Sequence, residues 1–125
     1  MFTTLPLVAL GGAIGASLRH LIGAAALRAF GPGFPIGTLL VNLAGCLAMG
    51  ILAALLADKT SPRLVPFLMT GILGGFTTYS AFALDTVGLW QRGDTGTAMA
   101  YILVTTAGSI AAVLVGMALV RAVTA

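Results

Sequence analysis

The chain has 125 residues, of which 59% are apolar and only 7% are charged, whereas a soluble domain typically carries about 25% charged residues. So few charges cannot cover a hydrophobic core, and the mean hydropathy of +1.12 indicates that most of the surface faces lipid. The net charge of +3 comes from six scattered Lys and Arg residues, which form no basic cluster able to neutralise nucleic-acid phosphates. The composition argues against a soluble enzyme, a nucleic-acid-binding protein and a disordered segment.

Residues that support metal or acid–base chemistry are scarce. The sequence contains one cysteine (Cys46), one histidine (His20), three aspartates (Asp58, Asp85 and Asp94) and no glutamate. A single cysteine excludes an intrachain disulfide and a cysteine-based metal site. We therefore expect a single domain, residues 1–125, without enzymatic activity.

Four apolar stretches are each long enough to cross a bilayer, which takes about 20 residues. They run approximately from Leu5 to Leu27, Ile36 to Ala57, Leu64 to Trp90 and Thr97 to Val120. Short segments rich in Gly, Pro and charged residues separate them, and short connections make consecutive helices antiparallel neighbours. The first stretch has no basic segment before it, so we interpret it as a retained helix and not as a signal peptide. The sequence predicts an all-α, multi-pass membrane protein with four transmembrane helices.

Glycine is abundant, with 17 residues. Small residues recur at intervals of about four along 11–16, 71–75 and 108–116, a pattern that lets helix backbones approach closely in lipid. We expect these faces to pack within the bundle. Because four short helices enclose little interior, we also expect an oligomer.

The third stretch contains the segment GILGGFTTYSAF, residues 71–82, with its middle near residue 77. Two adjacent glycines and two threonines are poor helix formers. A broken helix there leaves backbone carbonyls free at mid-membrane, which is tolerated only where protein, water or an ion satisfies them. The segment is therefore either an ion site made of backbone oxygens or an intact helix with a small packing face.

Asn42 lies near the middle of the second stretch, where a buried amide needs partners. It either forms a helix–helix hydrogen bond or offers its two N–H groups to a passing anion. Tyr79 and Phe82 share one helical face, and aromatic rings have positive edges that suit an anion. Packing is the alternative role for these rings.

A stripe of hydroxyl groups follows the fourth stretch at four-residue intervals: Thr97, Tyr101, Thr105 and Ser109. It rises about 18 Å along one helix face. An isolated hydroxyl in a membrane helix often bonds to its own backbone, but a stripe of this length is suited to solvating an ion along a path.

Arg19 lies late in the first stretch, beside His20. An arginine within a membrane span is costly and indicates either function or a side chain that reaches the interface. Either the Arg19 side chain snorkels to the membrane interface, or it acts as a cation that attracts anions at a pore mouth. Asp85 is a candidate salt-bridge partner.

Three ordered motifs resemble the Fluc/CrcB family of fluoride channels over nearly the whole chain. The first-helix motif GGxxGAxxR is matched from Gly11 to Arg19, and GTLxVNxxGxFxxG is matched from Gly37 to Gly50 with Leu47 in place of Phe. The third-helix motif GxxGGxTTFSTF is matched from Gly71 to Phe82, with Tyr79 in place of the first Phe and Ala81 in place of Thr.

The resemblance implies a fluoride channel that exports fluoride passively across a bacterial inner membrane. Its fold would be four transmembrane helices with a broken third helix, assembled as an antiparallel, dual-topology homodimer with two fluoride pathways. A structural sodium ion would lie on the two-fold axis, held by the carbonyls of Gly74 and Thr77. The residues implied along the fluoride pathway are Asn42, Tyr79, Ser80, Phe82, Tyr101, Thr105 and Ser109, with Arg19 at the vestibule. The hydroxyl of Tyr79 changes the size and polarity of that ring.

Two other functions compete with a channel. A small multidrug-type exporter is also a dual-topology dimer of four-helix subunits, but it needs a membrane-embedded carboxylate and this chain has no glutamate. A structural or regulatory subunit of a larger complex would carry no ion flux alone.

The basic residues at the two membrane faces are nearly balanced. The N-terminus, the second connection and the C-terminus share one side, which carries Lys59, Arg63 and Arg121. The other side carries Arg28 and Arg92, with Arg19 added if it reaches that interface. A positive-inside bias close to zero predicts insertion in both orientations.

Overall fold

The computed structural model describes residues 2–59 and 61–125, and within these ranges the protein is helical and has no β-strand. The elements in chain order are α1 (Leu5–Phe30), α2 (Ile36–Leu55), the π-helical segment η1 (Pro66–Leu73), α3 (Gly74–Phe76), α4 (Tyr79–Gln91) and α5 (Thr95–Thr124). They form four segments that are long and apolar enough to span a membrane: Leu5–Phe30, Ile36–Leu55, Pro66–Gln91 and Thr95–Thr124. The prediction of four membrane-spanning helices is confirmed.

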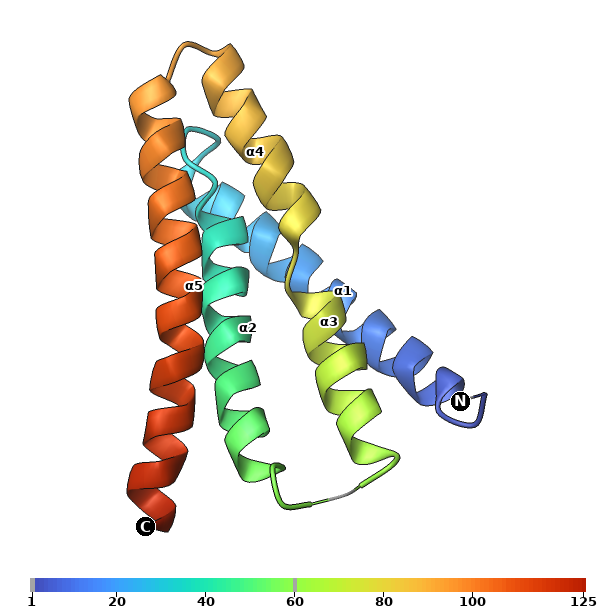
Figure 1. The fold of residues 1–125 in the computed structure, drawn as a ribbon. Coiled ribbons are helices and arrows are strands. Elements are labelled where there is room, and N and C mark those ends of the chain that lie inside the picture. Colours follow the sequence, from blue (N-terminus) through green and yellow to red (C-terminus); the bar gives the residue numbers. More distant parts are fainter. Residues whose placement is uncertain (1, 60) are drawn as a thin grey trace.

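The helices form two closely packed pairs (Figure 1). The long α5 runs beside α2, and α1 crosses behind the bundle obliquely to pack against η1 and α3, whereas α4 leans against α5. The 31–35 and 92–94 turns lie at the upper end, and residues 56–59, residues 61–65 and the C-terminus lie at the lower end. Gly31 and Gly93 have φ angles of 76° and 85°, a left-handed conformation that residues with a Cβ rarely adopt. The two glycines therefore let the chain reverse tightly at the upper end.

Glycines let the paired backbones touch, as the small-residue patterns predicted. A Cβ added to Gly15 would meet the carbonyl of Ile72, and one added to Gly50 would meet the carbonyl of Val113. A Cβ on Gly116 would in turn meet the carbonyl of Leu47. Lipid provides no hydrophobic drive between helices, so such close packing is a main source of their association.

The third membrane segment changes geometry along its length. In η1 the Gly74 N–H reaches back to the Met69 carbonyl, which is five residues earlier. After the single turn of α3, Thr77 (φ −84°, ψ 156°) and Thr78 (φ −150°, ψ 121°) are extended, and α4 begins at Tyr79. Two extended residues thus separate two helical pieces near the middle of this segment, and we call them the interruption.

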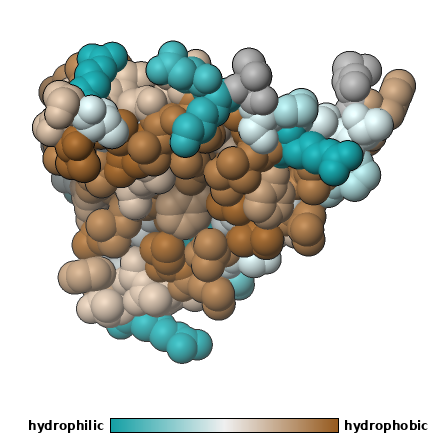
Figure 2. All heavy atoms as spheres, turned by 90° about the horizontal axis from the view of Figure 1, so that it is seen from below, coloured by the Kyte–Doolittle hydropathy of each residue, from teal (hydrophilic) through white to brown (hydrophobic). Residues whose placement is uncertain are grey.

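The buried core lies above the interruption, between α4 and α5. It consists of Phe82, Leu89, Ala98 and Tyr101, with Phe34, Leu39 and Ile102 packed against it. Much of the remaining apolar surface is exposed in the single chain. Figure 2 views the molecule from the lower end and shows hydrophobic atoms over most of this face, with hydrophilic residues mainly at the edge. This distribution suits a protein surrounded by lipid.

The close approach of α2 and α5 predicts a stability effect that is separate from the interruption. Gly50→Ala places a methyl group against the Val113 backbone, and overpacking of this kind costs about 1–3 kcal/mol. Thermal unfolding in detergent measures the loss. Gly96→Ala is the matched control because a Cβ there has open space in the same helix pair. Equal melting temperatures for the two variants would contradict close packing at Gly50.

Candidate functional site

Asn42 supplies the hydrogen bonds that the extended residue Thr78 loses by leaving the helix. The Thr78 N–H donates to Asn42 Oδ1 at 2.8 Å, and Asn42 Nδ2 donates to the Thr78 carbonyl at 2.9 Å. In a continuous α-helix the Thr78 N–H would bond to the Gly74 carbonyl. Asn42 is 7% exposed, so water has little access here. The Asn42 amide therefore takes the place of water as the hydrogen-bond partner of the Thr78 backbone. The second N–H of the Asn42 amide is not used by this pair.

Arg19 binds the other side of the interruption. Its Nε–H donates to the Gly75 carbonyl at 3.1 Å, an acceptor that the Tyr79 N–H would serve in a continuous helix. Among the described residues, Arg19 does not form the ion pair with Asp85 that the sequence suggested. Asp85 Oδ2 instead accepts a hydrogen bond from the Tyr101 hydroxyl at 3.1 Å.

The start of α4 presents N–H groups at the interruption. Thr78 is the N-cap, and its Oγ1 accepts from the Ala81 N–H at 3.1 Å. The N–H groups of Tyr79 and Ser80 belong to the first turn, which has no intrahelical acceptor. Because the N-terminal end of a helix carries a partial positive charge and the C-terminal end a partial negative charge, α4 favours an anion here and α3 favours a cation.

A cavity of about 290 Å³ opens beside Asn42, and we call it the Asn42 cavity. Its lining comes from α2, the interruption, α4 and α5: Asn42, Cys46, Thr77, Thr78, Tyr79, Phe82, Thr105, Thr106, Ser109 and Ile110. Thr105 Oγ1 and Ser109 Oγ are buried and have no hydrogen-bond partner among the described residues. Buried hydroxyls normally have a partner, and an exception calls for an explanation such as an absent water or ion.

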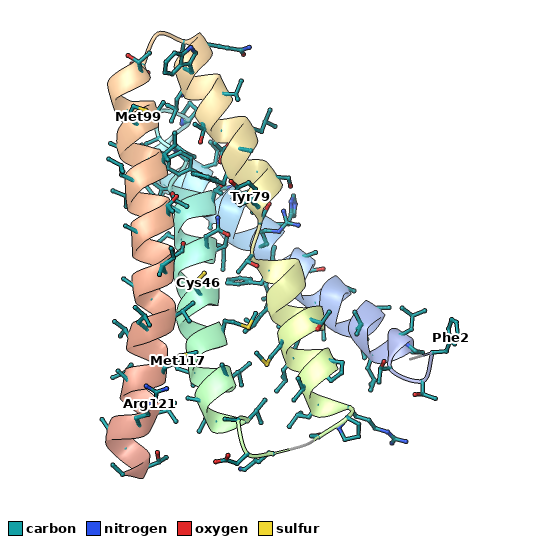
Figure 3. The ribbon with its side chains drawn as sticks, viewed as in Figure 1. Phe2, Cys46, Tyr79, Met99, Met117 and Arg121 are labelled. Atoms are coloured by element: carbon teal, nitrogen blue, oxygen red, sulfur yellow. The ribbon has the colours of Figure 1, made fainter. Side chains whose placement is uncertain are left out.

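Aromatic rings run from the cavity into the core. The Tyr79 and Phe82 centroids are 5.6 Å apart with an interplanar angle of 68°, and the Phe82 and Tyr101 centroids are 5.1 Å apart. The first contact is edge-to-face, which directs the positive edge of one ring at a negative face. Figure 3 shows Tyr79 beside the interruption and Cys46 on α2 below it.

A second cavity of about 540 Å³ lies between α1, α2 and α4, and we call it the Arg19 cavity. Its polar lining residues are Arg19, His20, Thr38 and Thr78. Thr78 lines both cavities, so the Thr78–Asn42 pair stands where the two cavities adjoin.

The structure brings together most of the residues singled out from the sequence. Those that line the Asn42 cavity are Asn42, Thr77, Tyr79, Phe82, Thr105 and Ser109. Ser80 is exposed, with its hydroxyl 3.4 Å from Thr78 Oγ1, and Gly74 is also exposed. Tyr101 is fully buried and lines neither cavity, and its hydroxyl bonds to Asp85.

Four residues that line the Asn42 cavity are not among the site residues predicted from the sequence: Cys46, Thr78, Thr106 and Ile110. Thr78 was treated only as a poor helix former, although it caps α4, pairs with Asn42 and lines both cavities. The sequence pointed to no site role for the single cysteine, yet Cys46 lines the Asn42 cavity. Its position one helical turn after Asn42 was the signal, because residues i and i+4 share a face.

Comparison with known proteins assigns the family. Residues 6–117 match the CrcB-like protein family, described as Camphor Resistance (CrcB). Proteins called fluoride-specific ion channel FluC are similar to this chain in Paracoccus denitrificans (57% identical over 114 residues, 91% of each chain) and Cereibacter sphaeroides (52% over 121 residues, 97% of each chain). A third, from Ruegeria, is 53% identical over 124 residues and 98% of each chain. These relatives carry the name of an ion channel and not of an enzyme, and the chain belongs to the CrcB-like family.

Proposed function

We propose that this protein is a fluoride-selective channel through which fluoride leaves the cell passively. The observation that carries the proposal is the pair of partnerless hydroxyls, Thr105 Oγ1 and Ser109 Oγ, in a cavity that also holds the Asn42 amide. Relatives covering nearly the full chain are named fluoride-specific ion channels, which supports fluoride as the anion.

The chemistry of the Asn42 cavity suits a small anion that must keep moving. Fluoride is strongly hydrated, so a pore has to replace its water with donors. Amide and hydroxyl groups and ring edges do this without a fixed positive charge that would trap the ion. Among the residues that the structure describes, no Lys, Arg or His lines this cavity. Fluoride would pass from the Arg19 cavity, beside the Asn42–Thr78 pair, and along Phe82 to Thr105 and Ser109.

The functional unit that we propose is an antiparallel homodimer with two such pathways. Tyr79 is 81% exposed in the single chain although it lies beside the interruption. A phenol hydroxyl within the hydrocarbon core needs a partner, and a second copy would provide cover. The near balance of basic residues between the two faces supports insertion in both orientations. The membrane would be the bacterial inner membrane.

A sodium ion on the two-fold axis of this dimer is also part of the proposal. The residues fit such an ion, because the Thr78 N–H bonds to Asn42 and leaves the Gly74 carbonyl without its helical partner. The carbonyls of Gly74 and Thr77 would hold the ion, as hard oxygen ligands. The bound ion would join the two chains by neutralising the C-terminal ends of both α3 helices.

Purified protein in liposomes should release fluoride and not chloride. A fluoride electrode measures the release from vesicles containing only this chain, and chloride efflux is recorded in parallel. Equal release of both anions would contradict fluoride selectivity. No release of either anion would favour a subunit of a larger complex, and transport that requires a proton gradient and a cationic drug would favour the exporter.

Thr105→Val should slow fluoride efflux without weakening the fold. Valine has the same shape but lacks the hydroxyl, and a buried hydroxyl without a partner costs about 1–3 kcal/mol. The melting temperature should therefore stay the same or rise while efflux falls about tenfold, as expected for the loss of one hydrogen bond to a charged group. Thr124→Val is the control because its hydroxyl bonds to its own helix at Val120. Unchanged efflux in Thr105→Val would assign the hydroxyl to packing.

The dual-topology proposal predicts the effect of added charge. Two or three lysines placed beside Lys59 should fix one orientation, because positive residues are retained on the cytoplasmic side. That chain alone should lose fluoride efflux from cells. Co-expression with a variant carrying added lysines beside Arg92, on the opposite face, should restore it. Full efflux by the charge-fixed chain alone would show that the dimer is parallel.

A further inference from the structure

We propose that Arg19 is a positioning residue: its Nε–H holds the Gly75 carbonyl and thereby keeps the interrupted third segment in its ion-binding shape. This inference rests on the proposed channel function, and it deepens it by giving the arginine a role other than attracting anions. The two roles predict opposite results for the same pair of substitutions.

The contact lies at a point where the chain has little freedom. Gly75 lies between Gly74 and Thr77, whose carbonyls are the proposed cation ligands. The α1 backbone reaches α3 directly, because a Cβ added to Gly75 would meet the Gly12 carbonyl at 2.7 Å and the Ala16 N at 3.2 Å. Arg19 lies one turn after Gly15, whose own Cβ would meet the Ile72 carbonyl. Glycines therefore fix α1 against the third segment, and Arg19 reaches the Gly75 carbonyl at 3.1 Å from that fixed base.

The interruption has one such support on each side. Asn42 of α2 bonds to both backbone groups of Thr78, and Arg19 of α1 bonds to the last turn before Thr77. Without Arg19 the Gly75 carbonyl would lack both its helical partner and a substitute in a bilayer, where an unsatisfied backbone group is costly. The interruption would then be held from the α2 side alone, and the bonds of the Thr78 and Ala81 N–H groups would open more often.

The charge of Arg19 is placed to act on the backbone. It lies at the C-terminal end of η1 and α3, where a helix carries a partial negative charge. Part of its field is therefore offset by the carbonyls that it contacts, and an anion in the Arg19 cavity experiences less than a full positive charge. For the shape of the third segment, the N–H donor of Arg19 therefore matters more than its positive charge does.

Three substitutions separate the donor from the charge. Arg19→Gln keeps an N–H donor at the same number of bonds from the backbone, because Gln Nε2 and Arg Nε are both attached to Cδ, but it removes the charge. Arg19→Lys keeps the charge and has a methylene at that position. Arg19→Met has a methyl group at that position and has neither the donor nor the charge.

The first measurement is fluoride efflux from liposomes. A positioning role predicts that Gln keeps efflux close to that of the wild type, whereas Lys and Met lose about tenfold, the loss expected for one hydrogen bond to a charged group. Near-normal efflux in Lys together with a large loss in Gln would overturn the proposal, because that order is the one expected of an anion-attracting charge. A Gln variant that does not fold would also contradict it, since Gln preserves the bond.

The second measurement does not depend on transport. Hydrogen–deuterium exchange reports the N–H groups of Thr78 and Ala81, which are bonded to Asn42 and to Thr78 Oγ1. Exchange at both should speed up about tenfold in Lys and Met, and stay close to the wild-type rate in Gln. Wild-type rates in all three variants would overturn the proposal. If the wild-type protein carries no fluoride, the channel proposal fails, whereas the exchange rates still decide whether Arg19 holds the segment.

Discussion

The rest of this structure depends on two extended residues, Thr77 and Thr78, in the middle of a membrane segment. A backbone that leaves helical geometry exposes N–H and carbonyl groups, and hydrocarbon offers them no partner. At Thr77 and Thr78 the protein supplies the partners from three elements: the Asn42 amide from α2, the Arg19 guanidinium from α1, and the Thr78 hydroxyl from the segment itself. The residues that look most like ion ligands in the sequence are thus also the ones that make the interruption possible.

In the proposed function, both kinds of ion site depend on one exchange of hydrogen-bond partner: the Thr78 N–H donates to Asn42 and not to the Gly74 carbonyl. By accepting the Thr78 N–H, Asn42 leaves the carbonyl of the exposed residue Gly74 without its helical partner, and this carbonyl is one of the proposed cation ligands. The same break starts α4 anew, so that its first N–H groups and its positive end point toward the region where an anion would pass. In the proposed channel, the cation site and the anion path would therefore both depend on the Asn42–Thr78 pair.

Hydropathy was enough to predict the four spans, because length and apolarity alone decide whether a helix can cross a bilayer. The ends were less predictable: α5 continues past Arg121 to Thr124, since helical hydrogen bonding does not stop at the first charged residue. Poor helix formers pointed to residues near 77, and the extended dihedral angles fall at Thr77 and Thr78.

Partners across helices were the least predictable part of the site. The sequence left Asn42 between a helix–helix bond and an anion donor, and the structure shows an amide bonded to a backbone and also lining a cavity. It suggested Asp85 for Arg19, whereas each binds elsewhere. Such pairs depend on the relative rotation and depth of two helices, which residue spacing within one helix does not contain.

The hydroxyl stripe of α5 shows that the interruption also affects the surroundings of side chains on another helix. Tyr101 and Thr105 share one face of this helix at a four-residue spacing, yet the Tyr101 hydroxyl is bonded to Asp85 and the Thr105 hydroxyl has no partner in the described chain. Within the described residues, α5 contacts α2 and α4 but neither η1 nor α3, which pack against α1 instead. The third segment thus covers α5 above the interruption and turns away from it below. The change of direction at Thr77 and Thr78 separates the paired, structural hydroxyl of Tyr101 from the hydroxyls of Thr105 and Ser109, which have no partner among the described residues.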